Sequence, residues 1–134
     1  MNWFLAKTEP AVYSIDQLEK DKKTTWDGVT NAQALNAIRK MKVGDKVLIY
    51  HSGGVSSIVG IAKVISASRE DPKNPKSVVV DLQYAGRVEP PVTLGEVKAS
   101  GLFPNFALVR QSRLSTMEVP EEFIDWLRGK NSLR

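Results

Sequence analysis

The sequence predicts one α+β domain, built on a small, partly open barrel of about five to six mixed strands with short flanking helices. The first observation is length: 134 residues suit a single domain, since domains commonly run to about 100–150 residues. The second is that stretches rich in β-branched and aromatic residues recur along the chain. The third is that short amphipathic stretches lie between them, with no internal repeat and no long linker. We therefore treat residues 1–134 as one unit.

The chain begins with an expected strand and a short helix. Residues 2–8 form an aromatic and apolar run that stops before Pro10, as a strand would. Ser14, with Gln17 three positions later, matches a capping box and predicts a helix that ends near Lys20.

A second helix and a buried strand are expected next. A charged loop at 20–23 leads to Thr30 and Gln33, which match a second capping box. Apolar side chains then recur at helical spacing, so we expect a helix over 31–42. Residues 45–51 are β-branched and apolar enough for a buried strand.

The second half of the chain is expected to hold three strands and two short helices. Residues 57–68 predict a long strand, and its small residues suggest a bend. Residues 69–76 contain two prolines and are expected to form a loop, whereas 77–84 alternate most cleanly between apolar and polar side chains. The remaining elements are a helix capped by Thr93 and Glu96, a strand at 106–111, and a helix from about Pro120 to Gly129.

Composition excludes several classes of protein. No apolar run comes near the roughly 18 residues of a membrane span, and the first ten residues lack the basic segment of a signal peptide. There is no cysteine, which excludes disulfides and thiolate metal sites, and His51 is the one histidine. We expect no metal, no cofactor, no membrane contact, a monomer, and a cytoplasmic location. The net charge of +4 fits a polyanionic partner and a soluble surface equally well.

The sequence makes no positive case for an enzyme. His51 and Ser52 are neighbours, but neighbouring strand residues point to opposite faces, and no G-x-S-x-G elbow is present. The two glycines that follow lack the spacing of a phosphate-binding loop. Adjacent acids at 70–71 and 121–122 are explained by a solvated turn and a helix start.

The densest recognition chemistry lies in residues 25–41. Trp26 offers a flat π-face, Asp27 accepts hydrogen bonds, and a helix start follows with unpaired backbone N–H groups. This equipment suits a flat, polar, heteroaromatic ligand. Each residue also has a structural explanation: core packing for Trp26, a turn over Gly28 for Asp27, and helix capping for Asn31.

Several segments occur in the order found in one known family. They are WFLAKTEPAVYS at 3–14, WDGVTN at 26–31, GD at 44–45, YHS at 50–52, VGIAKV at 59–64 and VRQSRLS at 109–115. Together they resemble the EVE domain family over nearly the whole chain. The resemblance implies a PUA-like fold, a pseudo-barrel with helices at its edges, and a relation to YTH-type and other readers of modified bases.

The resemblance implies a non-catalytic module that binds a modified base or nucleotide in RNA or DNA through an aromatic pocket. A small-molecule or protein-interaction module on the same fold is the alternative. Trp26 is the expected stacker, and Trp3 and Tyr50 are second walls or core residues. The expected polar contacts are Asp27, Asn31, His51, Ser52 and Lys7, and the expected contacts to the phosphate backbone are Arg110, Gln111 and Arg113.

The chain departs from the family pattern at the second helix. Thr30 and Leu35 stand where the family commonly has arginine, and Ala32 stands where it has tyrosine. Lys76 and Ser77 occupy a region where a tryptophan is common. We therefore expect phosphate contacts to come from elsewhere in the chain.

Overall fold

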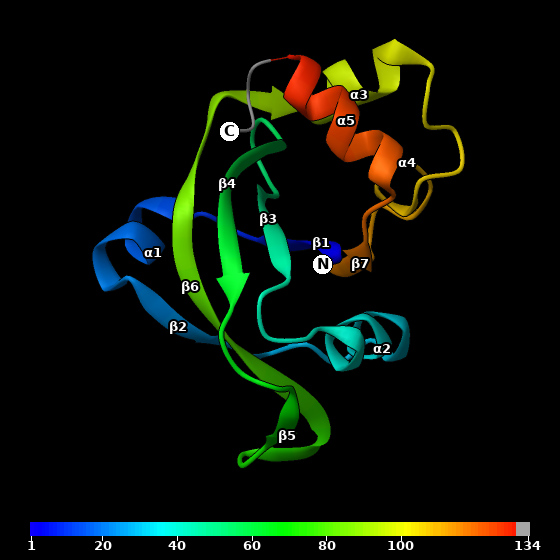
Figure 1. Cartoon of the computed structure of the whole chain (residues 1–134). Coiled ribbons are helices and arrows are strands. Elements are labelled where there is room, and N and C mark those ends of the chain that lie inside the picture. Colours follow the sequence, from blue (N-terminus) through cyan, green and yellow to red (C-terminus); the bar gives the residue numbers. More distant parts are fainter. Residues whose placement is uncertain (131–134) are drawn as a thin grey trace.

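A strongly curved sheet is the centre of the computed structural model, which describes residues 1–130 (Figure 1). Within those residues there are seven strands and five helices. The strands are β1 (Trp3–Thr8), β2 (Lys23–Trp26), β3 (Lys46–His51), β4 (Ser57–Val64), β5 (Arg69–Asp71), β6 (Asn74–Thr93) and β7 (Thr116–Glu118). The helices are α1 (Ile15–Asp21), α2 (Ala32–Lys40), α3 (Leu94–Ser100), α4 (Ala107–Arg110) and α5 (Glu121–Gly129).

The strand order is β2-β6-β4-β3-β1-β7, with β5 paired to β6. β1 and β3 are parallel and in register from Trp3 opposite Lys46 to Thr8 opposite His51, so both end at the same edge of the sheet. The other pairs are antiparallel. The pairing of β4 with the 20-residue β6 contains two register shifts, which increase the local twist and bend the sheet around the core. The fold is the expected α+β pseudo-barrel.

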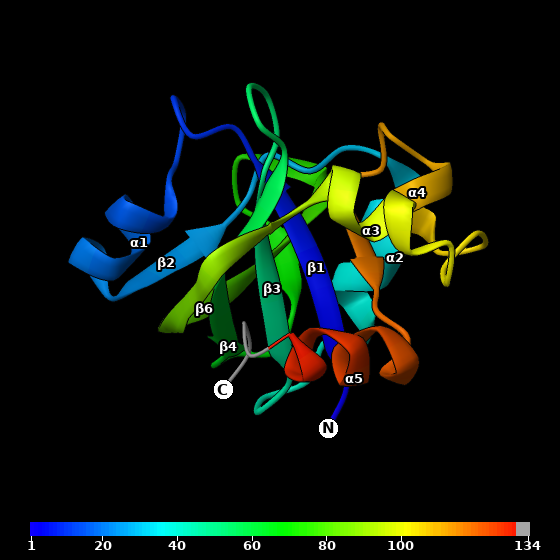
Figure 2. The same ribbon diagram turned by 90° about the horizontal axis from the view of Figure 1, so that it is seen from above.

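The helices cover different parts of this sheet (Figure 2). Helix α1 lies beside β2 and β6, and α2 lies on the other side, against β7 and β6. Helices α3, α4 and α5 gather at one end, where Phe123 is fully buried among aromatic rings. No helix within residues 1–130 is long and apolar enough to cross a membrane.

The strand expected at 106–111 is wrong: this segment forms the one-turn helix α4. The backbone N–H groups of Val109 and Arg110 both donate to the carbonyl of Phe106, at 2.9 and 3.0 Å. The turn buries Leu108. A short apolar run satisfies a strand and a buried helical turn equally well, so its pattern could not separate the two.

The loop expected at residues 69–76 is also wrong. They contain β5 and the first residues of β6, paired as a hairpin in which Asp71 lies opposite Asn74. Pro75 is tolerated because it lies near the tip of this short edge pairing. Strands β2 and β7 were not expected either. They are four and three residues long, and they form strands because they pair with longer neighbouring strands.

The helix starts follow the predicted capping chemistry, with two differences. The Thr93 and Glu96 capping box is confirmed, with both reciprocal bonds present. Ser14 accepts from the Gln17 N–H at 3.1 Å, as expected, but the Gln17 side chain donates to Asp21 instead of reaching back. Helix α2 is capped by Asn31, whose Oδ1 accepts from the Ala34 N–H at 3.0 Å, and not by Thr30.

Candidate functional site

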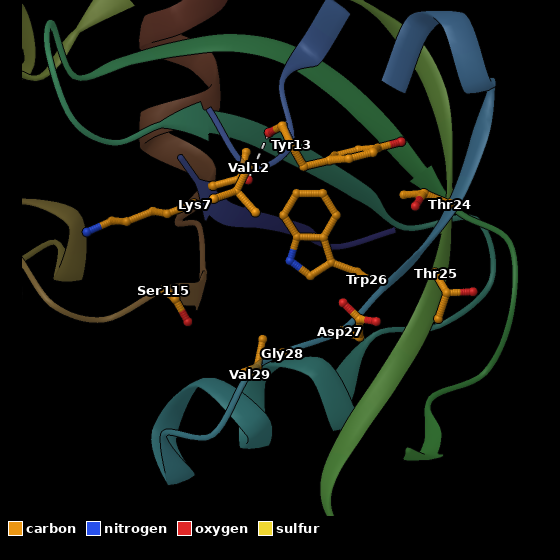
Figure 3. A pocket seen from close by; sticks show the side chains of 11 residues that line it. Lys7, Val12, Tyr13, Thr24, Thr25, Trp26, Asp27, Gly28, Val29 and Ser115 are labelled. Atoms are coloured by element: carbon orange, nitrogen blue, oxygen red, sulfur yellow. Dashed lines mark hydrogen bonds between the residues drawn. The ribbon is translucent and has the colours of Figure 1, made fainter. Parts of the chain in front are cut away.

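A cavity of about 400 Å³ opens where β1 ends (Figure 3). Its walls come from the end of β1, the loop at 9–13, strand β2, the segment at 27–29, and the residue before β7. This volume lies in the range of about 300–1,000 Å³ that is usual for ligand pockets. The lining residues are Lys7, Thr8, Val12, Tyr13, Thr24, Thr25, Trp26, Asp27, Gly28, Val29 and Ser115.

Trp26 forms a central part of this wall. It ends β2, where it pairs with Val80, and only 9% of its surface is exposed. Tyr13 meets it edge to face, with ring centroids 6.2 Å apart and planes at 87°. The indole nitrogen lies on the side of the ring toward Lys7 and Ser115, and no lining residue hydrogen-bonds to it (Figure 3). A ring face and a donor are therefore both available to a ligand in the cavity.

Charged and hydroxyl groups surround the indole. The Lys7 ammonium donates to the Ser112 carbonyl at 3.0 Å and lies 5.5 Å from the centroid of the buried Tyr50 ring. Burial lowers the pKa of Lys7 from its ordinary value. Asp27 is exposed and follows directly after Trp26. Gly28 has a φ of +78°, which lets the chain turn sharply after the carboxylate.

The loop that carries Tyr13 is fixed at both ends. The Thr8 hydroxyl donates to the Tyr13 carbonyl at 2.8 Å. Beyond the loop, the Ile15 N–H, at the first position of α1, donates to Nε2 of His51 at 3.0 Å. Because Nε2 accepts this bond, the imidazole is neutral, and burial lowers its pKa from the ordinary value.

Helix α1 is then held on β6 by an ion-pair cluster. The Arg87 guanidinium lies 2.6 Å from Glu19 and 2.7 Å from Asp16, and the Tyr84 hydroxyl donates to Glu19 at 3.0 Å. Hydrogen bonds to these carboxylates raise the pKa of Arg87. This cluster and the His51 contact both act on the helix that directly follows Tyr13.

The opposite wall has its own support. The hydroxyl of Ser77, which is buried in β6, donates to the Val29 carbonyl at 2.6 Å. This bond joins the segment at 27–29 to the hairpin of β5 and β6 across 48 positions of sequence.

Three of the residues singled out from the sequence line the cavity: Trp26, Asp27 and Lys7. The other expected ligand contacts are outside the lining set. Tyr50 is buried beneath Lys7, His51 holds the start of α1, and the Ser52 N–H donates to the Thr8 carbonyl. Asn31 caps α2, and Trp3 lines a separate hollow with Val119 and Arg128.

The residues expected to contact the phosphate backbone of a nucleic acid are exposed near the cavity. Arg110 ends α4 and donates to Asn105 at 3.1 Å, and Gln111 and Arg113 lie in the turn that follows. This turn reaches the cavity through Ser112, whose carbonyl is bonded to Lys7, and Ser115, which lines the wall.

Sequence reasoning missed part of the wall, above all Tyr13, Val12 and Ser115. Tyr13 and Val12 lie inside the segment 3–14 that carries the family resemblance, so that segment was the available signal. Ser115 likewise ends the matching segment 109–115, but only the pairing of β7 with β1 brings that segment to the cavity. In residues 1–130, no group of three or more histidine, aspartate or glutamate side chains is arranged to hold a metal ion.

The fold and the cavity define a PUA-like α+β module with an open pocket at the ends of its parallel strands. The chain belongs to the EVE domain family: the family model for the EVE domain matches residues 2–129. This match confirms the resemblance found in the sequence.

The relatives agree in sequence and in fold. Human thymocyte nuclear protein 1 is 30% identical over an alignment that covers 92% of this chain and 67% of the human protein. A solved structure from Agrobacterium tumefaciens has a TM-score of 0.91 at 33% identity, covering 99% of this chain and 94% of that one. The human THYN1 protein, solved in complex with 5-methylcytosine containing DNA, has a TM-score of 0.89 at 25% identity, covering 100% and 99%.

Proposed function

We propose that this chain is a non-catalytic module that binds a modified base of DNA or RNA by stacking it on Trp26. The observation that carries the proposal is a mostly buried indole whose remaining surface lines a cavity of about 400 Å³. The likeness to the human THYN1 protein, solved with 5-methylcytosine containing DNA, supports this class of ligand.

The groups around Trp26 suit the edge of a base. Stacking on an aromatic side chain is worth about 1–3 kcal/mol per base. The indole N–H and the Lys7 ammonium can donate to ring nitrogens or carbonyl oxygens, and Asp27 can accept from an exocyclic amine. The apolar wall at Val29 offers contact for a methyl-sized substituent on the base.

The exposed arginines beside the cavity supply the phosphate contacts in this proposal. Arg113 follows Ser112, which is bonded to Lys7 of the cavity, and Arg110 is one turn away on α4. Arginine binds phosphate oxygens through paired N–H groups. We expect the double variant Arg110→Ala and Arg113→Ala to bind more weakly and to flatten the salt dependence by about 0.7–0.9 in log–log slope per lost contact.

The direct test measures the affinity of Trp26→Ala for an oligonucleotide that contains 5-methylcytosine. We expect binding to weaken by roughly 5- to 150-fold, the equivalent of one lost stack. Trp126→Ala is the matched control, since it also removes an indole but lies on α5, outside the lining set. Circular dichroism shows that both variants are folded at the temperature used.

Two outcomes would count against the proposal. An unchanged affinity in Trp26→Ala would remove stacking on this residue as the basis of binding. Affinity for a free modified nucleoside without any salt-dependent affinity for oligonucleotides would favour the small-molecule module instead.

A further inference from the structure

The rim of the cavity contains an apolar turn at residues 9–12. The Val12 N–H donates to the Glu9 carbonyl at 2.9 Å, which closes a β-turn with Pro10 at its second position. Pro10, Ala11 and Val12 are all exposed, and Val12 is 77% exposed. Proline is common at this position of a turn, but Ala11 and Val12 are not typical turn residues, so two consecutive exposed apolar side chains after the proline are unusual here.

This turn is a fixed feature of the rim. The Thr8 hydroxyl bonds to the Tyr13 carbonyl at 2.8 Å, and the Tyr13 N–H donates to the Glu9 carbonyl at 2.9 Å. Val12 lines the cavity, and its side chain lies beside Trp26 in Figure 3. An apolar side chain is therefore held in solvent next to the position that a bound base would occupy.

A base in a duplex can reach this cavity only if its stack is opened, and the turn is placed where it could open that stack. A base paired in a duplex cannot reach a recessed indole, so it must rotate out of the stack, which costs unstacking energy. Proteins that open base steps commonly insert apolar side chains between them. The one charged residue of the turn is Glu9, a carboxylate that phosphates repel, so the turn is suited to a base step and not to the backbone.

We propose, on the basis of the function proposed above, that the turn at 9–12 is a wedge for duplex DNA. Val12, two positions after Pro10 in the turn, enters the base stack at the place vacated by the base that Trp26 holds. The wedge acts only where a stack has to be opened. It therefore contributes to the binding of a duplex and not to the binding of the same base in a single strand.

The test compares one 5-methylcytosine oligonucleotide as a duplex and as a single strand. Val12→Ala removes two carbons from the wedge, and at the usual value of buried apolar groups we expect roughly tenfold weaker duplex binding. Because Val12 also lines the cavity, affinity for the single strand should fall as well, but by no more than about threefold, so the wedge is measured by the larger loss in duplex binding. Val43→Ala is the matched control, because Val43 is also exposed, at 66%, but precedes β3 at the opposite end of the strands.

A fluorescent base analogue next to the methylated base provides a second measurement. We expect its fluorescence to rise when the wild-type protein unstacks it, and to rise less with Val12→Ala. Equal effects of Val12→Ala on duplex and single strand, or no effect on either, would overturn the wedge. Single-strand binding without duplex binding by the wild-type protein would overturn it as well. A wild-type protein that binds neither probe would instead contradict the proposed function.

Discussion

Trp26 and Trp126 have different surroundings although both contact other aromatic rings. Trp126 packs against Phe103 and Phe123, each with a centroid distance of 5.6 Å, and the Lys130 ammonium lies 4.9 Å from its ring. Within residues 1–130, Tyr13 is the one ring in contact with Trp26, at 6.2 Å. Trp26 is nevertheless buried, whereas Trp126 is partly exposed.

The two tryptophans show that a buried side chain is not always one that is packed only against other core residues. The surroundings of Trp126 are side chains of α3–α5 and their connections, so its contacts stabilise the fold. Part of the surroundings of Trp26 is a solvent-accessible cavity, so the 9% of its surface that stays exposed is open to a ligand. A low exposed fraction therefore does not identify a core residue when the exposed part of the side chain lines a cavity.

The largest expected effect is on stability, from Phe123→Ala. Phe123 is fully buried and contacts Phe106, Phe103 and Trp126, at centroid distances of 4.8, 5.1 and 5.6 Å. Its removal should lower the free energy of unfolding by about 3–5 kcal/mol, as for other buried aromatic residues. Denaturant unfolding measures this loss, and Trp26→Ala should cost less, because within residues 1–130 Trp26 contacts one aromatic ring and Phe123 contacts three. If Phe123→Ala and Trp26→Ala lowered the free energy of unfolding equally, Trp26 would contribute to the core as much as the aromatic cluster around Phe123 does.

Gly60→Ala should have the next largest effect, because Gly60 is where α1 approaches the sheet. A Cβ at this position would lie 2.7 Å from Cγ1 of Ile15, closer still to its Cδ1, and 3.1 Å from the Gly86 carbonyl. Ile15 is buried and cannot move freely, so we expect a loss of about 1–3 kcal/mol in the free energy of unfolding. Weaker ligand binding should accompany it, since α1 follows Tyr13 of the cavity wall.

The control for this prediction is a double-mutant cycle with Ile15→Ala. Removing the longer side chain creates space for the new methyl group, so Gly60→Ala should cost less in the Ile15→Ala background. Strictly additive costs would show that the collision is not with Ile15.

Ser77→Ala tests the other wall of the cavity and should have a smaller effect. The change leaves the Val29 carbonyl without the 2.6 Å hydrogen bond, at a cost of about 1 kcal/mol in the free energy of unfolding. Because Val29 lines the cavity, the affinity for the 5-methylcytosine oligonucleotide should fall a few-fold as well. Ser112→Ala is the control, since its contact to Lys7 uses the backbone carbonyl and survives the change. Affinity that is unchanged in Ser77→Ala would mean that the wall does not depend on this bond.

The sequence predicted the elements whose pattern is local and missed those that depend on pairing. Strand β3 and the box of Thr93 and Glu96 were predicted because a β-branched apolar run and a capping pair each lie within a few residues. The strand predicted at 106–111 was wrong, since one turn of helix shares its apolar composition. Strands β2 and β7 are too short to carry a pattern and exist through β6 and β1.

The same division holds for the candidate site. Trp26 and Asp27 were found because aromatic and carboxylate groups beside a glycine turn are visible in sequence. Ser115 was not, because more than a hundred residues separate it from Lys7 in the chain and β1–β7 pairing brings them together. His51 was expected to contact the ligand, whereas the structure gives it a bond to the start of α1.

The bond from the Ile15 N–H to His51 leads to the smallest expected effect, a dependence of stability on pH. Nε2 accepts at 3.0 Å only when the imidazole is neutral, and burial lowers the pKa of His51 in the folded protein. Asp16 acts in the opposite direction and Arg87 acts with the burial. Since the folded pKa lies below the unfolded value of about 6.5, the contribution is complete above that pH. It is lost as the pH falls from there through the folded pKa.

We therefore expect the wild-type protein to lose a few tenths of a kcal/mol of unfolding free energy, relative to His51→Gln, between pH 7.5 and pH 5, because solvent screens the partly exposed imidazole. Glutamine can accept from the same N–H through its amide oxygen but does not titrate, so the common effects of pH cancel in the comparison. Because α1 directly follows Tyr13, the affinity of the wild-type protein should decrease over the same range while that of His51→Gln stays nearer its value at pH 7.5. Parallel pH profiles for the two proteins would show that the His51 bond does not control the cavity wall, and would leave Arg87 as the contact that holds α1 in place.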